Sequence, residues 1–482
     1  MKSRIYVLGI VGFLCITYSI TLLPPMLVAA WYQDGELDDF FITFILLVSI
    51  GYLLWAPFRN KLGELRRSDG FLIVAIFWML LSLISALPFM TGWHLDFVDS
   101  LFEATSGFTT TGATVVTNLK DLPPSILYYR QQLQFFGGMG LIVLAIAVLP
   151  MLGVGGTQLY RAETPGPMKD EKMEPRIAQT VRGLSLIYFG LTVFCALGYW
   201  LAGMQPLDAL EHSFSTVSTG GFSTHDESLG YFHNQMINYI AVLFMLLGAI
   251  NFGIHFIAMS NRKLSAYLVD TEVRTFLLTT GMFVFFYTVY LYFSREYSSL
   301  FQSLNYSLFE VTSVITSTGY GITDFSTWPL FLPVLLIFIS FVGGCGGSTA
   351  GGIKVIRIMT LFKEAANQLF LLVHPKSCRP VKIGARVLNY KTAQAIWGFF
   401  AVYISSFVLL TILMVMAGLD EVTAFSAVAA CINNLGPGLG GVSATFASVS
   451  DNAKLIAVAA MLLGRLEIFT LLVIVTPEFW RR

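Results

Sequence analysis

The sequence predicts an all-α integral membrane protein with four pseudo-symmetric helix/pore-loop/helix modules around one pore, preceded by an accessory two-helix hairpin. The composition indicates the membrane, because 55% of the 482 residues are hydrophobic, only 12% are charged, and the mean hydropathy is +0.71. A short segment of hydroxyl residues and glycine, found four times along the chain, indicates the modules. Each copy has an apolar stretch of helical length on either side, so we expect each repeat to enter and leave the membrane.

The clearest copy of this segment is Thr-Ser-Thr-Gly-Tyr-Gly at 316–321. Related tripeptides are Thr-Thr-Gly at 110–112, Ser-Thr-Gly at 218–220 and, less closely, Asn-Leu-Gly at 434–436. Their glycines are 108, 99 and 117 residues apart, which is too long for a solenoid repeat and suits a whole membrane module. Four such modules around one axis would build a pore from a single chain.

The residue types in these segments favour a cation path. Closely spaced glycines reach positive φ without a Cβ clash, so the backbone can turn several carbonyls toward one axis. Such carbonyls can replace the water shell of a potassium ion. A pore helix that ends at the segment also directs its partially negative C-terminus toward the ion. The predicted filter residues are Thr110, Thr111, Gly112, Ser218, Thr219, Gly220, Ser317, Thr318, Gly319, Asn434, Leu435 and Gly436.

The first 60 residues carry no filter segment and predict the accessory hairpin. Its helices are expected at about 5–30 and 40–58, joined by an acidic loop at 34–39. The basic start, the apolar stretch and an Ala-Ala pair superficially suit a cleaved signal peptide. The apolar stretch exceeds 20 residues and a second span follows directly, so we expect the first helix to be retained.

The four modules follow in order, each as a helix, a re-entrant segment and a second helix. Ten spanning helices and four half-membrane pore helices result. The expected boundaries are 71–90, 97–116 and 131–153 for module one (71–153); 183–203, 207–224 and 235–259 for module two (183–260); 275–293, 299–325 and 329–362 for module three (275–363); and 394–418, 421–442 and 453–476 for module four (394–476).

The basic residues are distributed unequally between the two sides of this topology. One side receives 24 of the 29 Lys and Arg residues, including both ends of the chain, while Arg465 falls inside a span. By the positive-inside rule the basic side is cytoplasmic, so both termini are expected there.

Acidic residues accompany three of the four segments. Glu103, Glu211 and Glu310 stand nine residues before the filter glycine, and Ala427 takes the fourth place. We interpret the three carboxylates as favourable charges near the starts of the pore helices, with ion ligation as the alternative. The acidic residues Asp96, Asp99, Asp208 and Asp420 predict either an outer rim that attracts cations or simple helix caps and loop charges.

A glycine-rich stretch interrupts the second helix of module three. It has six glycines in ten residues, and each costs a continuous helix roughly 1 kcal/mol relative to Ala. We therefore expect a loop halfway across the membrane that acts as a mobile gate, the alternative being close helix packing through small residues. Ile353 replaces the lysine that a nucleotide-binding P-loop requires. The predicted gate residues are Gly343, Gly344, Cys345, Gly346, Gly347, Ser348, Thr349, Ala350, Gly351, Gly352 and the following Lys354.

Arg465 lies within the last predicted span. A buried arginine costs about 2.5–3.5 kcal/mol on insertion scales, so it needs a partner or a wet cavity. We interpret it as a positive barrier below the filter. The alternative is an ion pair, although Glu467, two residues on, faces a different side of a helix.

Other functional classes lack a matching pattern in the sequence. The six histidines and five cysteines show no metal-binding spacing, and no nucleophile and base motif indicates an enzyme. We expect no organic cofactor in this chain and no nucleic acid among its partners, which leaves a transported ion and the lipid bilayer.

Several longer motifs together resemble a known family over almost the whole chain. They are Thr-Thr-Thr-Gly-Ala-Thr at 109–114, His-Ser-Phe-Ser-Thr at 212–216, Gly-Gly-Phe-Ser-Thr-His-Asp at 220–226, Gly-Gly-Ser-Thr-Ala-Gly-Gly-Ile-Lys-Val-Ile-Arg at 346–357, Asn-Asn-Leu-Gly-Pro-Gly-Leu-Gly at 433–440 and Gly-Arg-Leu-Glu-Ile-Phe-Thr at 464–470. The chain resembles the Trk/Ktr/HKT superfamily of potassium transporters and, within it, the TrkH membrane subunits of bacteria.

This resemblance implies K⁺ uptake across the bacterial inner membrane through a gated pore, one per protomer of a homodimer. It also implies control by a cytosolic, TrkA-type nucleotide-binding ring. It assigns filter roles to Gly112, Gly220, Gly319 and Gly436, a gate to residues 343–352 and a charge barrier to Arg465. A Na⁺-coupled or Na⁺-permeable transporter of the same superfamily is the alternative.

Module four departs from the family pattern. Asn434 and Leu435 replace the hydroxyl pair, Pro437 follows the glycine, and only module three has the Gly-Tyr-Gly form. We therefore expect fewer and less symmetric ion sites than in a tetrameric potassium channel, and weaker selectivity.

Overall fold

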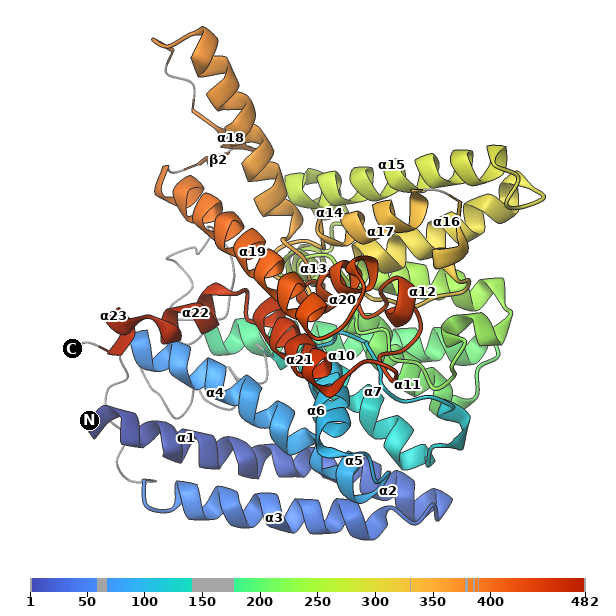
Figure 1. Cartoon of the computed structure of the whole chain (residues 1–482), viewed down its shortest axis with the longest axis vertical. Coiled ribbons are helices and arrows are strands. Elements are labelled where there is room, and N and C mark those ends of the chain that lie inside the picture. Colours follow the sequence, from blue (N-terminus) through green and yellow to red (C-terminus); the bar gives the residue numbers. More distant parts are fainter. Residues whose placement is uncertain are drawn as a thin grey trace.

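The structure is a computed structural model that describes residues 2–58, 67–140, 177–329, 331–377, 380–384, 386–388 and 390–480. It confirms the predicted all-α membrane fold. The modules follow one another around the middle of the molecule, from blue through green and yellow to orange and red, and both termini lie at one end of the helix bundle (Figure 1). Large apolar side chains on the outer helices, including Leu53, Leu201, Phe285 and Met416, are exposed and therefore suited to lipid.

The accessory hairpin consists of α1 (Lys2–Ser19), a 3₁₀ turn (Ile20–Leu22) and α2 (Leu23–Tyr32), followed by α3 (Leu37–Trp55). The chain changes from α1 to α2 where prolines occupy the first turn of α2, because proline lacks the N–H that a continuous helix would use. The two arms approach closely, since a Cβ at Gly12 would lie 2.6 Å from the carbonyl oxygen of Gly51.

The modules are built from the helices that now follow in chain order. Module one comprises α4 (Arg67–Ser85), α5 (Leu87–Thr91), α6 (Phe97–Phe108) and α7 (Pro124–Gly138). Module two comprises α10 (Ile177–Leu201), α11 (Pro206–Val217), α12 (Gln235–Gly248) and α13 (Phe252–Asn261), with α14 (Ser265–Val269) after it. Module three comprises α15 (Thr271–Phe293), α16 (Leu300–Ile315), α17 (Leu332–Ser340) and α18 (Val355–Val373). Module four comprises α19 (Tyr390–Met416), α20 (Glu421–Ile432), α21 (Asp451–Arg465) and α22 (Phe469–Val475), and α23 (Pro477–Trp480) ends the described chain.

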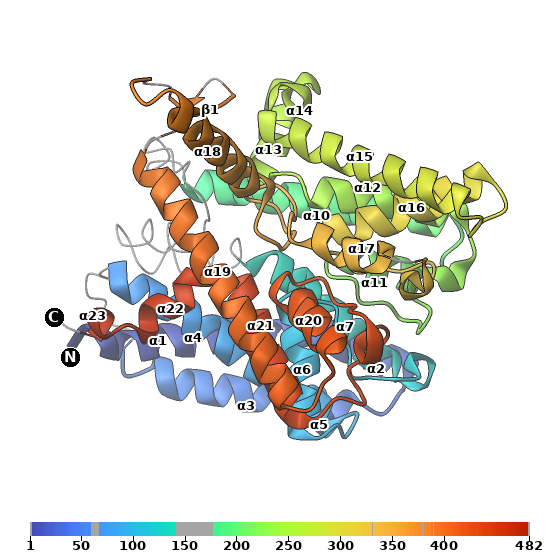
Figure 2. The same ribbon diagram turned by 45° about the horizontal axis from the view of Figure 1, so that its top comes forward.

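Among the described residues the strands are β1 (Lys382–Ile383) and β2 (Arg386–Val387), which form an antiparallel hairpin beyond α18. In Figure 2 this hairpin lies at the upper left, and both termini lie on the left of the molecule.

The pore helices α6, α11, α16 and α20 have 12, 12, 16 and 12 residues. At 1.5 Å per residue they are roughly 18–24 Å long, too short for a hydrocarbon core of about 30 Å. Sequence-encoded caps fix where three of them begin. The side chains of Asp96, Ser299 and Asp420 accept hydrogen bonds from backbone N–H groups in the first turn.

The second helices are broken in more places than the sequence predicts. Residues 235–259 were expected as one helix, yet α12 and α13 meet at 95°, and residues 453–476 divide into α21 and α22 at 110°. Asn251 caps the new helix start in module two, and Glu467 and Ile468 have positive φ in module four. In module three the predicted loop separates α17 from α18.

The described ranges contain part of the ten spanning helices expected from the sequence. Within the described ranges six helices are long and apolar enough to span, or eight if each bent pair counts as one span. The predicted helix at 131–153 includes residues 141–153, which lie outside the described residues, and the one at 329–362 contains the loop.

Candidate ion pathway

The four filter segments share one backbone conformation. Each pore helix is followed by a cap residue and then by a residue with positive φ, namely Thr110, Thr219, Ser317 and Asn434, at 52–56°. The backbone N–H of the next residue donates a hydrogen bond to a carbonyl near the end of the pore helix. For example, Thr111 N donates to Ser106 O at 2.9 Å and Thr318 N donates to Ser313 O at 2.8 Å. Left-handed conformations at four non-glycine residues are costly individually, so their recurrence marks a constrained site.

These segments also form a closed ring. A Cβ added to Gly112 would lie 2.1 Å from Gly220 O, and one added to Gly221 would lie 1.9 Å from Thr318 O. Likewise, a Cβ added to Gly319 would lie 1.9 Å from Leu435 O, and one added to Gly436 would lie 2.8 Å from Thr111 O. Each glycine thus lies against a carbonyl of the next module, and module four closes onto module one.

The ring corrects the predicted register in module two. The sequence match takes Ser218, Thr219 and Gly220 as equivalent to residues 110–112. In the structure Ser218 is the cap residue, Thr219 has the positive φ, and Gly221, at φ 79°, is the counterpart of Gly112. The two adjacent glycines make the tripeptide match ambiguous, and backbone conformation resolves it.

The side chains around the ring differ from module to module. Thr109 and Thr111 share a hydrogen bond of 2.7 Å between hydroxyls, and Thr316 and Thr318 share one of 2.8 Å. In module four, Asn434 Nδ2 donates to Thr111 Oγ1 at 2.9 Å and thereby bridges the last segment to the first. The filter is therefore pseudo-symmetric in backbone and asymmetric in side chains.

The regularly spaced glutamates have a different role from the predicted one at the helix starts. Glu103 and Glu310 lie within their pore helices rather than near the starts, and both are fully buried. Glu103 accepts from Val115 N at 3.0 Å, and Glu310 accepts from Ile322 N at 2.8 Å. Both carboxyl groups therefore brace the chain that follows the filter.

Modules two and four brace this chain with other residues. With the corrected register, His212 and not Glu211 is the counterpart of Glu103, and its Nε2 lies 3.0 Å from Ser223 Oγ. In module four, Ser426 Oγ accepts from Leu439 N at 2.9 Å, beside the small Ala427. The same task is thus performed by a carboxylate, an imidazole or a hydroxyl.

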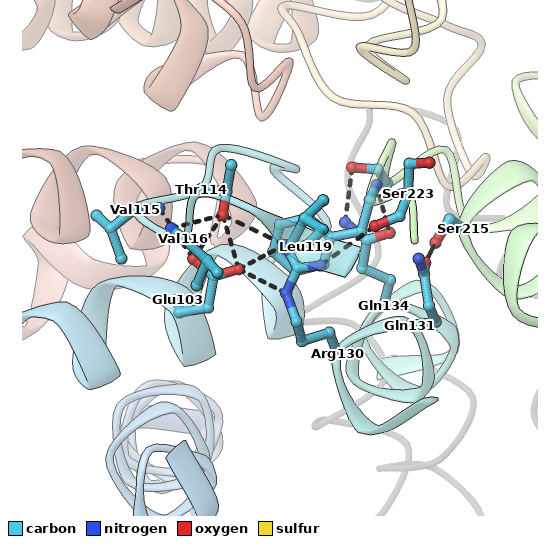
Figure 3. A network of polar contacts seen from close by, with 12 residues as sticks. Glu103, Thr114, Val115, Val116, Leu119, Arg130, Gln131, Gln134, Ser215 and Ser223 are labelled. Carbon is cyan, nitrogen blue, oxygen red and sulfur yellow. Dashed lines mark hydrogen bonds and ion pairs between the residues drawn. The ribbon is translucent and has the colours of Figure 1, made fainter. Parts of the chain in front are cut away.

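A buried ion pair within module one also contacts module two through its arginine (Figure 3). Arg130, on α7, lies 2.7 Å from Glu103, and the two side chains are 1% and 0% exposed. Arg130 Nη1 also donates to Ser223 O at 3.2 Å, across the module boundary. Arg130 was not predicted as a site residue, because nothing in its local sequence pattern indicates a partner 27 residues away.

The acidic residues predicted as a rim or as caps act chiefly as caps. Asp96 and Asp420 accept hydrogen bonds from the amides of Asp99 and Thr423. Asp208 accepts from Thr224 Oγ1 at 2.9 Å, and Asp99 forms an ion pair with Lys454. Of the two interpretations offered, these contacts support caps and local charge pairs.

The glycine-rich stretch is a loop, as predicted, and it is bonded to the break between α12 and α13. Cys345 N donates to Ala249 O at 2.9 Å, and Thr349 N donates to Gly248 O at 3.2 Å. In return, Phe252 N donates to Gly347 O at 3.1 Å. Carbonyls released by the broken helix are therefore satisfied by the loop, as a membrane interior requires.

Thr349 connects the loop to the filter segment of module two. Its hydroxyl donates to Val217 O at 3.1 Å and lies 3.2 Å from the hydroxyl of Thr219. Gly351 fits so closely that a Cβ there would lie 1.9 Å from Asn433 O. The loop is thus packed directly beneath two filter segments.

Arg465 meets this loop at the end of α21. Its guanidinium donates to Thr349 O at 3.1 Å and to Gly137 O at 2.6 Å, and its Cζ lies 5.5 Å from the ring centre of Trp78. Glu467 forms an ion pair with Arg357. Arg465 and Glu467 therefore contact different partners, as the sequence leads us to expect.

A cavity of about 130 Å³ lies among these groups. Its walls include residues 347–352, Lys354, Arg465, Glu467 and the filter residue Asn434. It has room for several water molecules. The structure therefore brings together the predicted gate residues, the predicted barrier and one end of the filter.

Comparison with known proteins identifies the architecture. The family model described as TrkH, cation transport protein, matches residues 36–481. The chain belongs to the TrkH family. A TrkH crystal structure from Vibrio parahaemolyticus, titled a potassium transporter, superposes with a TM-score of 0.91 at 46% identity and covers 100% of both chains.

Curated TrkH-family relatives match over nearly their whole length. The Trk system potassium uptake protein TrkH of Escherichia coli K12 is 50% identical over 474 residues, covering 98% of each chain. The protein of the same name from Vibrio parahaemolyticus is 48% identical over 479 residues, covering 98% of this chain and 99% of the relative. TrkG of Escherichia coli K12, also named a Trk system potassium uptake protein, is 42% identical over 472 residues.

Proposed function

We propose that this chain takes up K⁺ across a bacterial inner membrane as the pore-forming subunit of a Trk system. One observation carries the proposal, namely the closed ring of four segments with a shared left-handed residue and a glycine against the neighbouring carbonyl. The names of the relatives supply the ion. Both termini, at one end of the bundle, are assigned to the cytoplasm because basic residues concentrate on that side.

The carbonyls of the ring would replace water around K⁺. With the corrected register, the ligands come from Thr110, Thr111, Gly112, Thr219, Gly220, Gly221, Ser317, Thr318, Gly319, Asn434, Leu435 and Gly436. The four pore helices end at the ring, so their partially negative C-termini favour a cation there. No side chain needs to change charge for the ion to pass.

Residues 343–352 act as the gate and Arg465 as the electrostatic barrier. The loop contacts two filter segments and lines the cavity, so any displacement of the loop changes the width of the path. The guanidinium of Arg465 is bonded to the loop at Thr349 O, so motion of the loop also moves the positive charge relative to the path.

The partners proposed are a second copy of the chain and a cytosolic nucleotide-binding ring of the TrkA type. The relatives are named as members of a Trk system, which supports a multicomponent assembly. The apolar helix surfaces and the basic connections on the side of the termini supply separate faces for lipid, for the second copy and for the ring.

A Na⁺-permeable or Na⁺-coupled path is the second candidate. The observation that favours it comes from module four. Leu435 and Pro437 flank the glycine of that segment, which lacks the pair of hydrogen-bonded threonine hydroxyls found in modules one and three. A less regular ring holds its carbonyls less uniformly and discriminates less sharply between ions.

The zero-current potential of purified protein distinguishes the two candidates. With K⁺ on one side of a bilayer and Na⁺ on the other, we expect a K⁺-directed potential corresponding to at least about tenfold preference, or about 1.4 kcal/mol. Adding Na⁺ to both sides should not increase K⁺ flux. A potential near zero with measurable current would favour the Na⁺-permeable alternative, and absence of any current from the complete complex would contradict the proposed function.

Arg465 provides a second test, directed at the barrier. The Arg465→Gln variant keeps amide donors for Thr349 O and removes the charge. We expect K⁺ flux without the partner ring to rise about tenfold, because a unit charge about 10 Å from an ion contributes about 1.7 kcal/mol at an effective dielectric constant of 20. The Arg465→Lys variant, which keeps the charge, should stay near the unmodified protein. Equal flux in all three proteins would contradict an electrostatic barrier.

A further inference from the structure

The filter segment of module two lacks a side chain that its counterparts carry. Thr111 in module one and Thr318 in module three each pair with the threonine two residues before. The equivalent residue in module two is Gly220. A Cβ at Gly220 would lie 2.4 Å from Cδ of Gln134, so the space that threonine fills elsewhere is filled here by a side chain from module one.

Gln134 comes from α7 and is fully buried. Its Nε2 donates to Gly220 O at 2.7 Å, and its Oε1 accepts from Phe222 N at 3.1 Å. These two bonds enclose Gly221, the glycine of the ring. One helical turn earlier, Arg130 donates to Ser223 O, so one face of α7 binds three backbone atoms of this short segment (Figure 3).

This arrangement is found in module two alone within the described chain. The carbonyls of Thr111, Thr318 and Leu435 are the counterparts of Gly220 O, and no comparable side-chain donor contacts them among the residues that the structure describes. One carbonyl of the proposed filter is therefore fixed by an amide that does not belong to its own module.

We propose that Gln134 is a positioning residue that sets the contribution of Gly220 O to ion selection. This inference rests on the proposed function of the ring as a K⁺ filter. A hydrogen-bonded carbonyl moves less, and part of its negative charge is already engaged. Release of the carbonyl would let it approach a smaller ion and would raise its field strength, so both accounts of K⁺ selectivity predict that Na⁺ gains.

The first test replaces Gln134 by methionine, which keeps the length and removes both hydrogen bonds. In zero-current measurements between K⁺ and Na⁺, we expect the K⁺ to Na⁺ permeability ratio to fall about three- to tenfold, as expected for the loss of a buried hydrogen bond. Gln132→Met is the matched control. Gln132 is also buried on α7, and its amide donates to Thr21 O of the accessory hairpin, so its ratio should not change.

The second test replaces the support from the Gln134 amide by support from a threonine hydroxyl at position 220. Gly220→Thr alone places its Cβ against Gln134 and should reduce the ratio. Combined with Gln134→Ala, the same threonine gains space and can pair with Ser218, the counterpart of Thr109 and Thr316. The paired variant should return to within about twofold of the unmodified protein, since one buried hydrogen bond replaces another.

These outcomes distinguish failure of the proposed filter from failure of the proposed role of Gln134. An unmodified protein without K⁺ preference would contradict the proposed filter itself. A selective unmodified protein whose ratio is unaffected by Gln134→Met would contradict only the role of Gln134. If the single methionine variant is not recovered as folded protein, the paired variant decides, because a ratio no better than that of Gly220→Thr would overturn the inference.

Discussion

Replacing Gly221 by alanine is expected to reduce K⁺ conduction about a hundredfold or more. The residue has φ 79°, where an L side chain costs about 1–2 kcal/mol. Its new Cβ would also lie 1.9 Å from Thr318 O, an atom of the neighbouring filter segment. Because each 1.4 kcal/mol corresponds to about tenfold, strain and displacement of that carbonyl together reach this size. Single-channel or flux measurements on the purified protein would give the value.

Gly220→Ala is the matched comparison one residue earlier. Its Cβ meets the end of the Gln134 side chain rather than backbone, so we expect a clearly smaller loss. Gly281→Ala, on α15, is the neutral control, because nothing lies within 4 Å of its added Cβ. A larger effect at Gly220 than at Gly221 would restore the register inferred from the tripeptide and reject the one derived from backbone conformation.

Removal of Arg130 is expected to destabilise the protein by about 3–5 kcal/mol, because it leaves the carboxylate of Glu103 buried and without its cation. The Arg130→Met variant keeps much of the side-chain volume and removes every donor. Thermal unfolding of the detergent-solubilised protein, followed by intrinsic fluorescence, should show a lower midpoint than for the unmodified protein. Adding Glu103→Gln should recover part of the loss, because the buried charge is then absent as well.

Lys454→Met offers the comparison for this pair. Lys454 also pairs with an aspartate, Asp99, but that carboxylate is 21% exposed and can be hydrated when its partner is removed. We expect a cost of about 1 kcal/mol or less. Equal costs at the two pairs, or no recovery in the Arg130→Met and Glu103→Gln double variant, would argue against a buried uncompensated charge as the cause.

Composition and spacing were sufficient for the membrane fold, the four modules and the interrupted helix of module three. Six glycines in ten residues are a local signal, because no continuous helix accommodates them cheaply. The breaks after α12 and α21 have no such signal. Ile468 has positive φ although its side chain disfavours it, so tertiary contacts must impose that conformation.

The site was predictable in its chain segments and less so in its contacts. The sequence locates the four segments of the proposed filter to within one residue, and the uncertainty comes from two adjacent glycines in module two. Placing Glu103 and Glu310 near helix starts was wrong, because α6 and α16 begin at Phe97 and Leu300, close to the expected starts, and both glutamates lie beyond the first turn. Gln134 and Arg130 could not be identified, since their partners are distant in sequence and are mostly backbone atoms.

A filter encoded in four unlike segments of one chain has an evolutionary consequence. In a homotetramer, a single codon change alters four ligands together, so ion preference shifts in large steps. Here the four left-handed positions are Thr110, Thr219, Ser317 and Asn434, and each can be altered alone. Ion preference can therefore be adjusted at one segment at a time.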